Sequence, residues 1–323
     1  MTKVSIIIRC YNEEKHIGKL LTGITQQTYQ DYEIILVDSG STDATVAIAS
    51  RYPIKIVSIA PEEFSFGRSL NLGCKEAQGE YLVIVSAHVY PLYRDWLKNL
   101  IQPFETPQVA LVYGKQTGNE VTKYSEQQIF SKWFPDESNF NQSHPFCNNA
   151  NAAIRKTLWQ DNPYDEKLTG LEDLAWSNKM QSLGYCIAYS AKAVIVHVHD
   201  EPAGKIYNRY RREAIAFKRI FLQESFSILD FLRLFFANLV SDYYHAVLDK
   251  KFLENLFSIP IFRLMQFWGT YQGFCQHNQA LQQVRNTFYY PRNLNRGDQV
   301  EPLRDAVDYT KSLPHEAKVS ELR

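Results

Sequence analysis

The chain has 323 residues with 35 basic and 35 acidic side chains, so its formal net charge is zero. A balanced charge argues against a general role in nucleic-acid binding, and the length is sufficient for a complete α/β core with an additional region. The five cysteines show no paired spacing, which favours reduced thiols in the cytoplasm over a disulfide framework or a zinc site. Since a predicted strand begins at residue 4, we expect no N-terminal secretion signal.

The first forty residues predict a strand, a helix and a second strand. Residues 4–8 and 33–37 are uninterrupted apolar runs, typical of strands that are buried on both faces. Between them, apolar residues recur at helical spacing from Ile17 to Ile24, which indicates a parallel crossover. Ligands of such sheets bind at the carboxyl ends of the strands, so the pattern favours a nucleotide site there. Alternatively, residues 38–41 form an ordinary strand-to-helix turn that binds nothing.

The α/β pattern continues to about residue 114. Further helices are predicted near 43–51, 67–77 and 93–102, and further strands near 54–58, 81–85 and 109–113. Residues 115–147 are polar and aromatic with little periodicity. A loop of this length inside a compact domain is usually functional or mobile, so we expect a flap.

From residue 201 onwards the periodicity is helical. Apolar residues from Ile228 to Val247 share one face of a predicted helix whose other side is polar, so this segment is amphipathic and cannot be a transmembrane span. Pro260 interrupts the pattern, and a more aromatic stretch follows it. These helices could cover the sheet or each other, or they could contact a membrane surface or a second copy of the chain. From Asn293 the chain is charged and nearly free of aromatic residues, which predicts a loose tail to its end.

Several motifs follow one another in the order of a known enzyme family. They lie at residues 4–13, 33–43, 66–73, 77–85, 148–155, 163–166, 170–176 and 197–199. Over residues 3–200 this layout resembles the family-2 glycosyltransferases of the GT-A fold, and within that family the bacterial rhamnosyltransferase-type members. The resemblance implies an inverting enzyme that uses a nucleotide-sugar donor.

The resemblance also implies the fold and its division. We expect an α/β protein with the Rossmann-like mixed sheet of the GT-A fold, flanked by helices and followed by a C-terminal helical extension. Residues 1–114 would form the nucleotide-binding half and residues 115–200 the acceptor-binding half of one catalytic domain, with the flap on the acceptor side. Residues 201–292 would form the helical region, and residues 293–323 the loose tail.

The family motifs place the donor at the strand ends and on the third helix. The residues that would bind the nucleotide sugar are Cys10, Tyr11, Asn12, Glu13, Asp38, Ser39, Arg68, Asn71, Ser86, Ala87 and His88. Family members often have two consecutive acids where this chain has Asp38 and Ser39. Asp38 could accept the imide proton of uracil, or Ser39 could donate to a base such as cytosine, so thymidine-, uridine-, guanosine- and cytidine-linked donors remain open.

The sugar transfer requires a carboxylate that takes the proton of the acceptor hydroxyl. Glu172 and Asp173 are the best candidates, and they begin a predicted helix, where an acid can also merely complement the helix dipole. The resemblance favours Asp173 as the general base and Glu172 as the group that orients the acceptor. It also implies acceptor contacts by Asn149, Asn151 and Trp176.

The Asp-x-Asp metal loop of the family is absent, because residues 86–88 are Ser-Ala-His. A loop histidine usually has no metal, but His199 lies where the family often has a metal-contacting histidine. Together, His88 and His199 could bind Mn²⁺ or Co²⁺ more readily than Mg²⁺. Alternatively, transfer is metal-independent and Arg209 and Arg212, which share a predicted helix face, neutralise the diphosphate. That basic face could instead be solvated or bind anionic lipid.

The sequence therefore predicts a glycosyltransferase of bacterial surface polysaccharide synthesis. Its acceptor would be a glycan or a lipid-linked saccharide, and the enzyme would work in the cytoplasm or at the inner face of the cell membrane, alone or as an oligomer. One alternative is an inactive GT-A scaffold that binds a nucleotide, a glycan or a protein, which the missing Asp-x-Asp suggests. The other is a sugar nucleotidyltransferase, which the lack of glycine in residues 10–13 disfavours.

Overall fold

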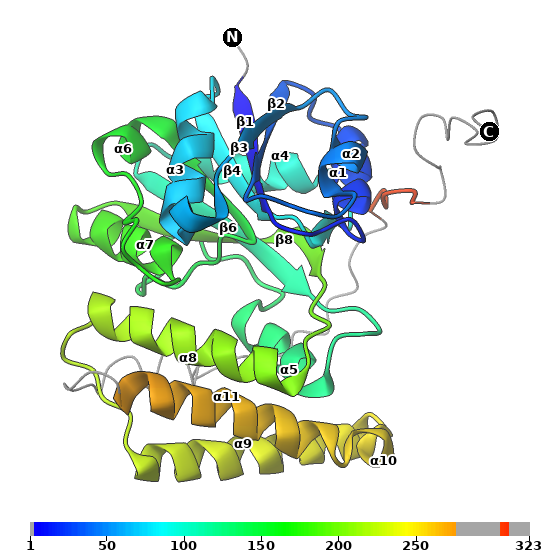
Figure 1. Ribbon diagram of the computed structural model, residues 1–323, viewed down its shortest axis with the longest axis vertical. Helices are drawn as coiled ribbons and strands as arrows, with labels where there is room; N and C mark the ends of the chain where they lie inside the picture. Colours follow the sequence, from blue (N-terminus) through cyan, green and yellow to red (C-terminus); the bar gives the residue numbers. More distant parts are fainter. Residues whose placement is uncertain (1–2, 276–303, 310–323) are drawn as a thin grey trace.

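The computed structural model describes residues 3–275 and 304–309, and these contain one sheet of eight strands (Figure 1). The strands are β1 (Val4–Cys10), β2 (Tyr32–Asp38), β3 (Lys55–Ser58), β4 (Tyr81–Ser86), β5 (Val89–Pro91), β6 (Val109–Thr117), β7 (Asn151–Arg155) and β8 (Cys186–His197), in the spatial order β3-β2-β1-β4-β7-β6-β8-β5. β1 runs parallel to β2 and β4, whereas β7 is antiparallel to β4 and β6. The predicted parallel crossover and the mixed α/β class are confirmed.

Helices cover both faces of this sheet. On one face lie α1 (Ile17–Thr25), α2 (Thr45–Ala49) and α4 (Trp96–Ile101), and on the other lie α3 (Phe66–Glu76), α6 (Lys156–Asp161) and α7 (Glu172–Ser182). Two short 3-10 turns, η1 (Pro61–Glu63) and η2 (Gln102–Glu105), connect elements at the edges. In β1, Ile6 and Ile8 pack with Leu20 of α1, while Ile7 packs with Leu70 of α3. Burial on both faces explains the uninterrupted apolar strand sequence.

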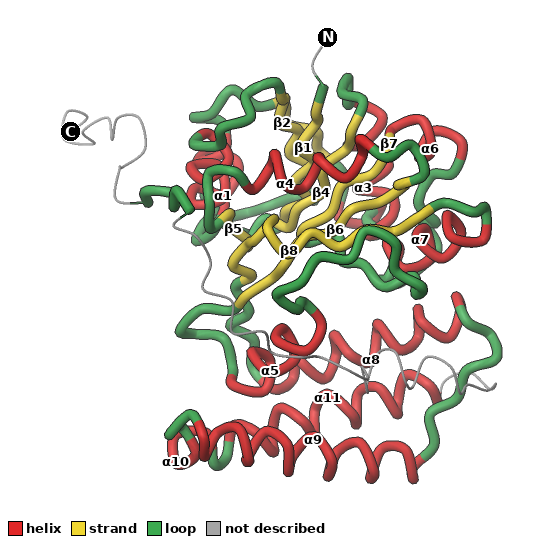
Figure 2. The backbone as a smooth tube through the Cα atoms, turned by 180° about the vertical axis from the view of Figure 1, so that it is seen from behind, coloured by secondary structure: helices red, strands yellow, loops and turns green. Residues whose placement is uncertain are grey.

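The helical region lies against one end of the sheet domain (Figure 2). It contains α8 (Ala203–Ile220), α9 (Ile228–Leu248), α10 (Phe252–Asn255) and α11 (Ser258–Cys275), and α5 (Tyr124–Trp133) packs beside it. α8 and α11 can approach closely because α11 has glycine at positions 269 and 273. A Cβ atom at Gly269 or Gly273 would lie only 2.5 Å from a carbonyl oxygen of α8. No helix in the described ranges is both long enough and apolar enough to cross a membrane.

A buried ion pair joins α9 to α11. The guanidinium of Arg263 donates to both carboxylate oxygens of Asp242, at 2.7 and 2.8 Å, and its remaining Nη1 donates to Gln266 Oε1 at 2.8 Å. Both charged side chains are at most 1% exposed. The Asp242 carboxylate, on the polar side of α9, is therefore turned inward and has its partner there.

Removal of one partner of this pair should be costly. Asp242→Ala leaves the Arg263 charge buried without its carboxylate, so we expect the free energy of unfolding to fall by about 3–5 kcal/mol in denaturant titrations. The double change Asp242→Leu with Arg263→Met should recover most of the loss, whereas Glu254→Ala at an exposed position should have little effect. Equal stability of Asp242→Ala and wild type would contradict a structural role of the pair.

Two expectations about irregular segments need correction. Residues 115–147 are not one flap, since β6 continues to Thr117 and α5 buries one side in the helical region. The tail is not loose at residues 304–309, where the backbone N–H of Arg94 donates to the carbonyl of Asp305 at 3.0 Å. The remainder of the predicted tail lies outside the described residues.

Candidate functional site

A cavity of about 680 Å³ opens at the carboxyl ends of the parallel strands. There Cys10 of β1 pairs with Asp38 of β2, and Arg9 with Ser86 of β4. The walls come from the loop after β1, the connection from β4 to β5, the first turn of α7, residues 197–201 and the inner face of α8. We call this space the cleft. Its position is the one that the strand–helix–strand pattern predicts.

Hydrogen bonds join the loops that follow β1 and β2. The backbone N–H of Asn12 donates to Ser41 Oγ at 2.9 Å, and its side-chain oxygen accepts from the N–H of Thr42 at 2.8 Å. Asp38 accepts from the backbone N–H groups of Gly40 and Ser41, both at 3.1 Å. The carboxylate of Asp38 thus shapes its own turn, as the alternative interpretation of this segment expects.

Two adjacent carboxylates begin α7 at the cleft wall. Asp173 is 8% exposed and accepts hydrogen bonds from the backbone N–H groups of Asn149 and Leu174, both at 2.8 Å. Glu172 Oε1 accepts from Arg9 Nη1 at 3.2 Å. The pair is therefore held in a fixed orientation from two sides.

The residue before this pair has an unusual backbone. Leu171 has φ 55° and ψ 30°, a left-handed conformation that is rare for leucine. Backbone strain of this kind persists where the surrounding structure imposes it, and it clusters at functional sites. Here it aims the first turn of α7, with both carboxylates, into the cleft.

The environment of Asp173 changes its acidity. Burial, and next the negative charge of Glu172, raise the pKa of Asp173 from its usual value near 4 toward neutrality. The two backbone hydrogen bonds and Arg9 oppose this rise. A carboxylate with a raised pKa is a stronger base, and it can still be ionised near neutral pH.

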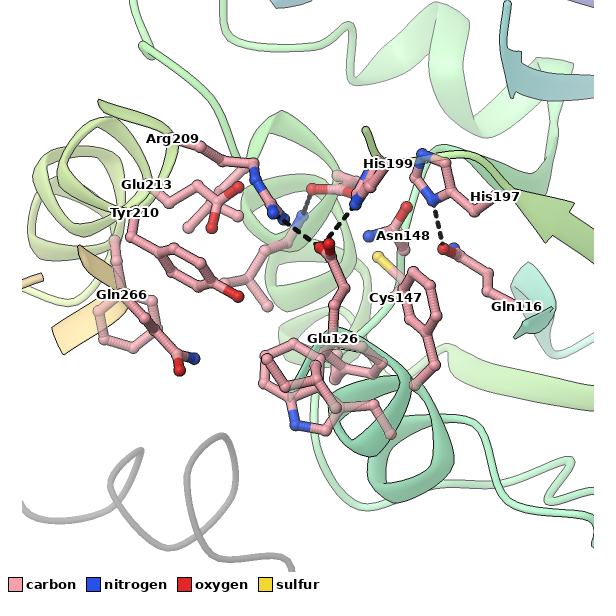
Figure 3. A pocket seen from close by; sticks show the side chains of 18 of the residues that line it. Gln116, Glu126, Cys147, Asn148, His197, His199, Arg209, Tyr210, Glu213 and Gln266 are labelled. Atoms are coloured by element: carbon pink, nitrogen blue, oxygen red, sulfur yellow. Dashed lines mark hydrogen bonds and ion pairs between the residues drawn. The ribbon is translucent and has the colours of Figure 1, made fainter. Parts of the chain in front are cut away.

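Three imidazoles meet at the wall between the cleft and α5. One ring nitrogen each of His88, His197 and His199 lies within 4.8 Å of the others. Each Nδ1 is bonded to an oxygen, namely Glu13 Oε1 at 2.8 Å for His88, Gln116 Oε1 at 2.8 Å for His197 and Glu126 Oε1 at 2.6 Å for His199 (Figure 3 shows the last two). This arrangement leaves the Nε2 atoms available. We call these three residues the imidazole cluster.

The imidazole cluster fits a divalent cation. Burial, together with the positive charges of neighbouring groups such as Arg209, lowers the pKa of His197 and His199 well below the ordinary range, so both rings are neutral at pH 7. Neutral imidazole is the form that binds metal, and such ligands usually donate their other ring N–H to an oxygen. The Nε2 atom of His197 is buried and has no hydrogen-bond partner among the residues that the structure describes.

Three arginines surround the same space. The guanidinium groups of Arg9 and Arg212 stack on the ring of Phe66, at 4.4 and 4.6 Å from its centroid. Arg209 pairs with Glu126 at 2.7 Å and with Glu201 at 2.8 Å. Because Glu126 also binds His199, one buried carboxylate connects Arg209 to the imidazole cluster.

A second, smaller cavity of about 140 Å³ adjoins the cleft and shares part of its wall (Figure 3 shows many of its lining residues). It shares Asp173, His197, His199 and Arg209 with the cleft, but most of its remaining wall is apolar and includes several aromatic rings, with Phe130 and Trp133 of α5 among the residues. We call it the aromatic pocket. Its apolar wall lies next to Asp173, the candidate base.

Most of the predicted site residues lie together. Those that line the cleft are Tyr11, Asn12, Glu13, Ser86, His88, Asn149, Glu172, Asp173, His199, Arg209 and Arg212. Those that do not line it are Cys10, Asp38, Ser39, Arg68, Asn71, Ala87, Asn151 and Trp176. Of this second group, Cys10, Ser39 and Ala87 are buried beside the strand ends.

Asp38 accepts hydrogen bonds within its own turn, and the other four residues have partners within the protein. Asn151 is fully buried and accepts from Trp96 Nε1 at 2.9 Å, and the indole N–H of Trp176 donates to a backbone carbonyl, so neither side chain faces an acceptor. The side-chain oxygen of Asn71 accepts from Trp159 Nε1 at 3.0 Å. Arg68 pairs with two glutamates at 3.6 Å, at the rim rather than in the cleft.

Five residues of the site were missed in the sequence analysis. They are Arg9, Phe66, Gln116, Glu126 and His197. For His197 a signal existed, because residues two apart in an extended segment point to the same side, so His197 and His199 should act together. For the others no local pattern distinguishes them from ordinary strand and helix residues.

Comparison with known proteins finds a family that part of the chain matches. Residues 5–161 match the family described as glycosyl transferase family 2. The O-antigen chain rhamnosyltransferase RfbN of Salmonella typhimurium is 29% identical over 64% of this chain and 70% of its own length. The O-antigen chain rhamnosyltransferase WbaN of Salmonella anatum is 26% identical over 65% of this chain and 70% of its own length.

Solved structures show the same fold. The mannosyltransferase PcManGT of Pyrobaculum calidifontis, solved in complex with GDP-Man and Mn²⁺, is 20% identical, covers 84% of both chains and has a TM-score of 0.57. Residues 1–349 of TarS from S. aureus, in complex with UDP, are 19% identical with a TM-score of 0.51, over 95% of this chain and 99% of that one. The GT-A fold predicted from the motifs is thereby confirmed.

Proposed function

Because the chain belongs to the family-2 glycosyltransferases, we propose that it transfers a sugar from a nucleotide sugar to a saccharide acceptor with inversion of the anomeric centre. The observation that carries this proposal is Asp173, a buried carboxylate of raised pKa that faces the cleft beside the imidazole cluster. A base and a set of positive groups at one cavity are what a single displacement requires. Family membership sets aside the sugar nucleotidyltransferase alternative.

The proposed chemistry uses the two carboxylates differently. Asp173 takes the proton of the acceptor hydroxyl. At the same time the hydroxyl oxygen attacks the anomeric carbon of the donor, and the bond from that carbon to the diphosphate breaks. Glu172, which Arg9 holds in place, orients the acceptor. Since one displacement occurs, the product has the opposite anomeric configuration.

The departing diphosphate needs positive charge. We assign a divalent cation to His88, His197 and His199, which would supply part of that charge when bound. A set of neutral nitrogen ligands favours Mn²⁺ or Co²⁺ over Mg²⁺, which prefers oxygen. Arg209 and Arg212 would supply the rest, and would act alone if transfer is metal-independent. The Mn²⁺ in the related mannosyltransferase structure supports the first arrangement.

The acceptor would approach Asp173 from the aromatic pocket. Aromatic rings can stack on sugar rings and accommodate apolar groups, and this pocket lies on the side of Asp173 away from the β1 and β2 loops. The O-antigen rhamnosyltransferases among the relatives favour a glycan or lipid-linked saccharide of a bacterial surface polysaccharide. Such an acceptor would place the enzyme in the cytoplasm, at the inner face of the cell membrane.

A panel of nucleotide sugars tests this function. The purified chain with Mn²⁺ should release a nucleoside diphosphate from one donor, and release should accelerate when a matching acceptor is added. NMR of the product should show the inverted configuration. A product of retained configuration would refute the single displacement, and failure to bind or turn over any nucleotide sugar would favour an inactive scaffold.

Nucleotide binding should depend on Arg212. Arg212→Ala removes a charged group from the cleft wall, and one charge-assisted hydrogen bond is worth about tenfold or more in affinity, so we expect calorimetry to show that loss for a nucleoside diphosphate. Arg219→Ala on the same helix is the control, because Arg219 is exposed and donates to the carbonyl of Lys167. Equal affinities of the two variants would remove Arg212 from the diphosphate site.

A further inference from the structure

The helical region has an outer surface that is almost entirely apolar. Ten residues of α9 are exposed, and only one of them, Arg233, is charged; the four exposed residues of α11 are all apolar. The most prominent side chains are Leu229, Phe236, Val240 and Tyr244 on α9 and Leu253 and Phe257 in and after α10, each at least 55% exposed. We call this surface the outer apolar face.

The outward side of α9 differs from that of an ordinary surface helix because it is apolar, while the inward side mixes apolar residues such as Phe231 and Leu234 with polar ones. Its inward side carries buried Asp230, Asn238 and Asp242, and the Asp242 carboxylate is paired with Arg263. A helix that covers a water-soluble domain normally turns its apolar stripe inward and its polar side outward. Exposure of the outward side of α9 to water is therefore energetically unfavourable.

The size of the outer apolar face exceeds that of a chance patch. The exposed side chains amount to roughly 1,000 Å² of apolar surface, whereas the largest patch on a typical monomer is about 300–600 Å². That area would also suit a dimer interface. However, protein interfaces are usually about 56–65% apolar and contain many hydrogen-bonding groups, whereas this face has few, chiefly those of Arg233, Tyr244 and Trp268.

We propose that the outer apolar face docks on a phospholipid surface. α9 and α11 run side by side at the end of the molecule opposite the N-terminus, so both can lie flat on such a surface (Figure 1). Lys250 and Lys251, exposed in the turn after α9 beside the exposed acids Asp249 and Glu254, can contact anionic headgroups at its edge. Tyr244 and Trp268 are side chains of the kind that prefers the boundary between lipid and water. The helices insert from one side and do not span the bilayer.

The docked orientation would bring the cleft close to the lipid. α8 packs against α11 on one side and presents Arg209 and Arg212 to the cleft on the other. The cleft would then open one or two helix layers above the headgroups, within reach of a saccharide carried on a membrane lipid. This inference rests on the helical surface alone, so it can fail while the glycosyltransferase proposal holds.

Vesicle flotation of the full chain tests the docking. Vesicles of phosphatidylethanolamine and phosphatidylglycerol should carry the wild-type protein, and high salt should weaken binding only in part because insertion is mainly apolar. The triple change Leu229→Gln, Phe236→Gln, Phe257→Gln should lower partitioning by at least about tenfold, because it removes three large inserted side chains. Leu183→Gln, at an exposed leucine of the sheet domain, should bind like wild type.

A spectroscopic measurement does not depend on the triple variant. Of the five tryptophans, only Trp268 is classed as exposed, so brominated lipid should quench its fluorescence, and Trp268→Phe should abolish that quenching. Absence of flotation and quenching for the wild type would overturn the proposal. So would unchanged flotation of the triple variant. A wild-type dimer that ignores vesicles and that the triple change dissociates would identify the face as a contact between copies instead.

Discussion

Asp173→Asn is expected to slow sugar transfer by roughly a hundred- to ten-thousandfold, the usual contribution of a general base. The amide keeps the shape of the side chain but cannot take the proton of the acceptor hydroxyl. Because Asp173 approaches the cleft from the first turn of α7 rather than from the nucleotide-binding loops, donor affinity should barely change. Single-turnover kinetics and nucleotide calorimetry separate the two quantities.

Glu172→Gln is the matched control for this change. It alters the adjacent carboxylate and its contact with Arg9, so it should cost less in rate than Asp173→Asn and act mainly through the acceptor KM. Near-normal turnover of Asp173→Asn with a known acceptor would refute the assignment of the base. A loss in Glu172→Gln equal to that in Asp173→Asn would mean that the pair acts as one unit.

The pH dependence of the wild type follows from the same residue. Because the pKa of Asp173 is raised, the carboxylate is protonated at higher pH than an ordinary aspartate, and only the ionised form can accept a proton. The rate should therefore fall as the pH drops below neutrality, well before an ordinary aspartate near pH 4 would be protonated.

His197→Ala should abolish most of the affinity for Mn²⁺ or Co²⁺. Removal of a residue that hydrogen-bonds to a metal-binding side chain typically lowers the metal affinity by about 10–100-fold. We therefore expect removal of a metal-binding side chain itself, such as that of His197, to lower the affinity by about a hundredfold or more. Calorimetry with the metal alone measures this without reference to activity. His245→Ala is the control, because His245 lies on α9 and its Nδ1 bonds the carbonyl of Ser241.

The metal assignment has two outcomes that contradict it. One is equal Mn²⁺ affinity of His197→Ala and His245→Ala. The other is complete loss of turnover in chelator with full rescue by Mg²⁺ alone, since a set of three imidazoles should bind Mg²⁺ poorly. Glu126→Gln should give an intermediate loss, because it leaves all three imidazoles but weakens the support of His199.

The strand ends could be predicted from the sequence because the burial of a strand is visible in its own short run of residues. Apolar runs such as residues 4–8 need burial on both faces, and the chain leaves such strands at a common edge. The position of Asp173 in the first turn of a helix could be predicted because a helix start is visible in the sequence, whereas its role as the base stays a prediction from the family motif. The class of the fold and the location of the cleft follow from these two facts.

The partners of these residues could not be predicted, since they come from distant segments. Glu126 reaches His199 from a helix in a stretch without clear periodicity, and its role exists only through the tertiary fold. Asn151 and Trp176 are polar or amphipathic residues within motifs that resemble those of the family, but whether such a side chain faces a ligand or another group of the protein depends on packing. The sequence also does not say which side of an amphipathic helix is turned toward the rest of the protein, as α9, which packs on α11, illustrates.

His199 and Arg209 share the carboxylate of Glu126, which would couple the two proposed binding events, that of a cation and that of a diphosphate. A cation at the imidazole cluster would draw negative charge from Glu126 and loosen its hold on Arg209, which would free that guanidinium for the diphosphate. By linkage, a bound diphosphate must then raise the affinity for the cation by the same factor. Each ligand alone would bind weakly, and the two together would bind as a cooperative pair.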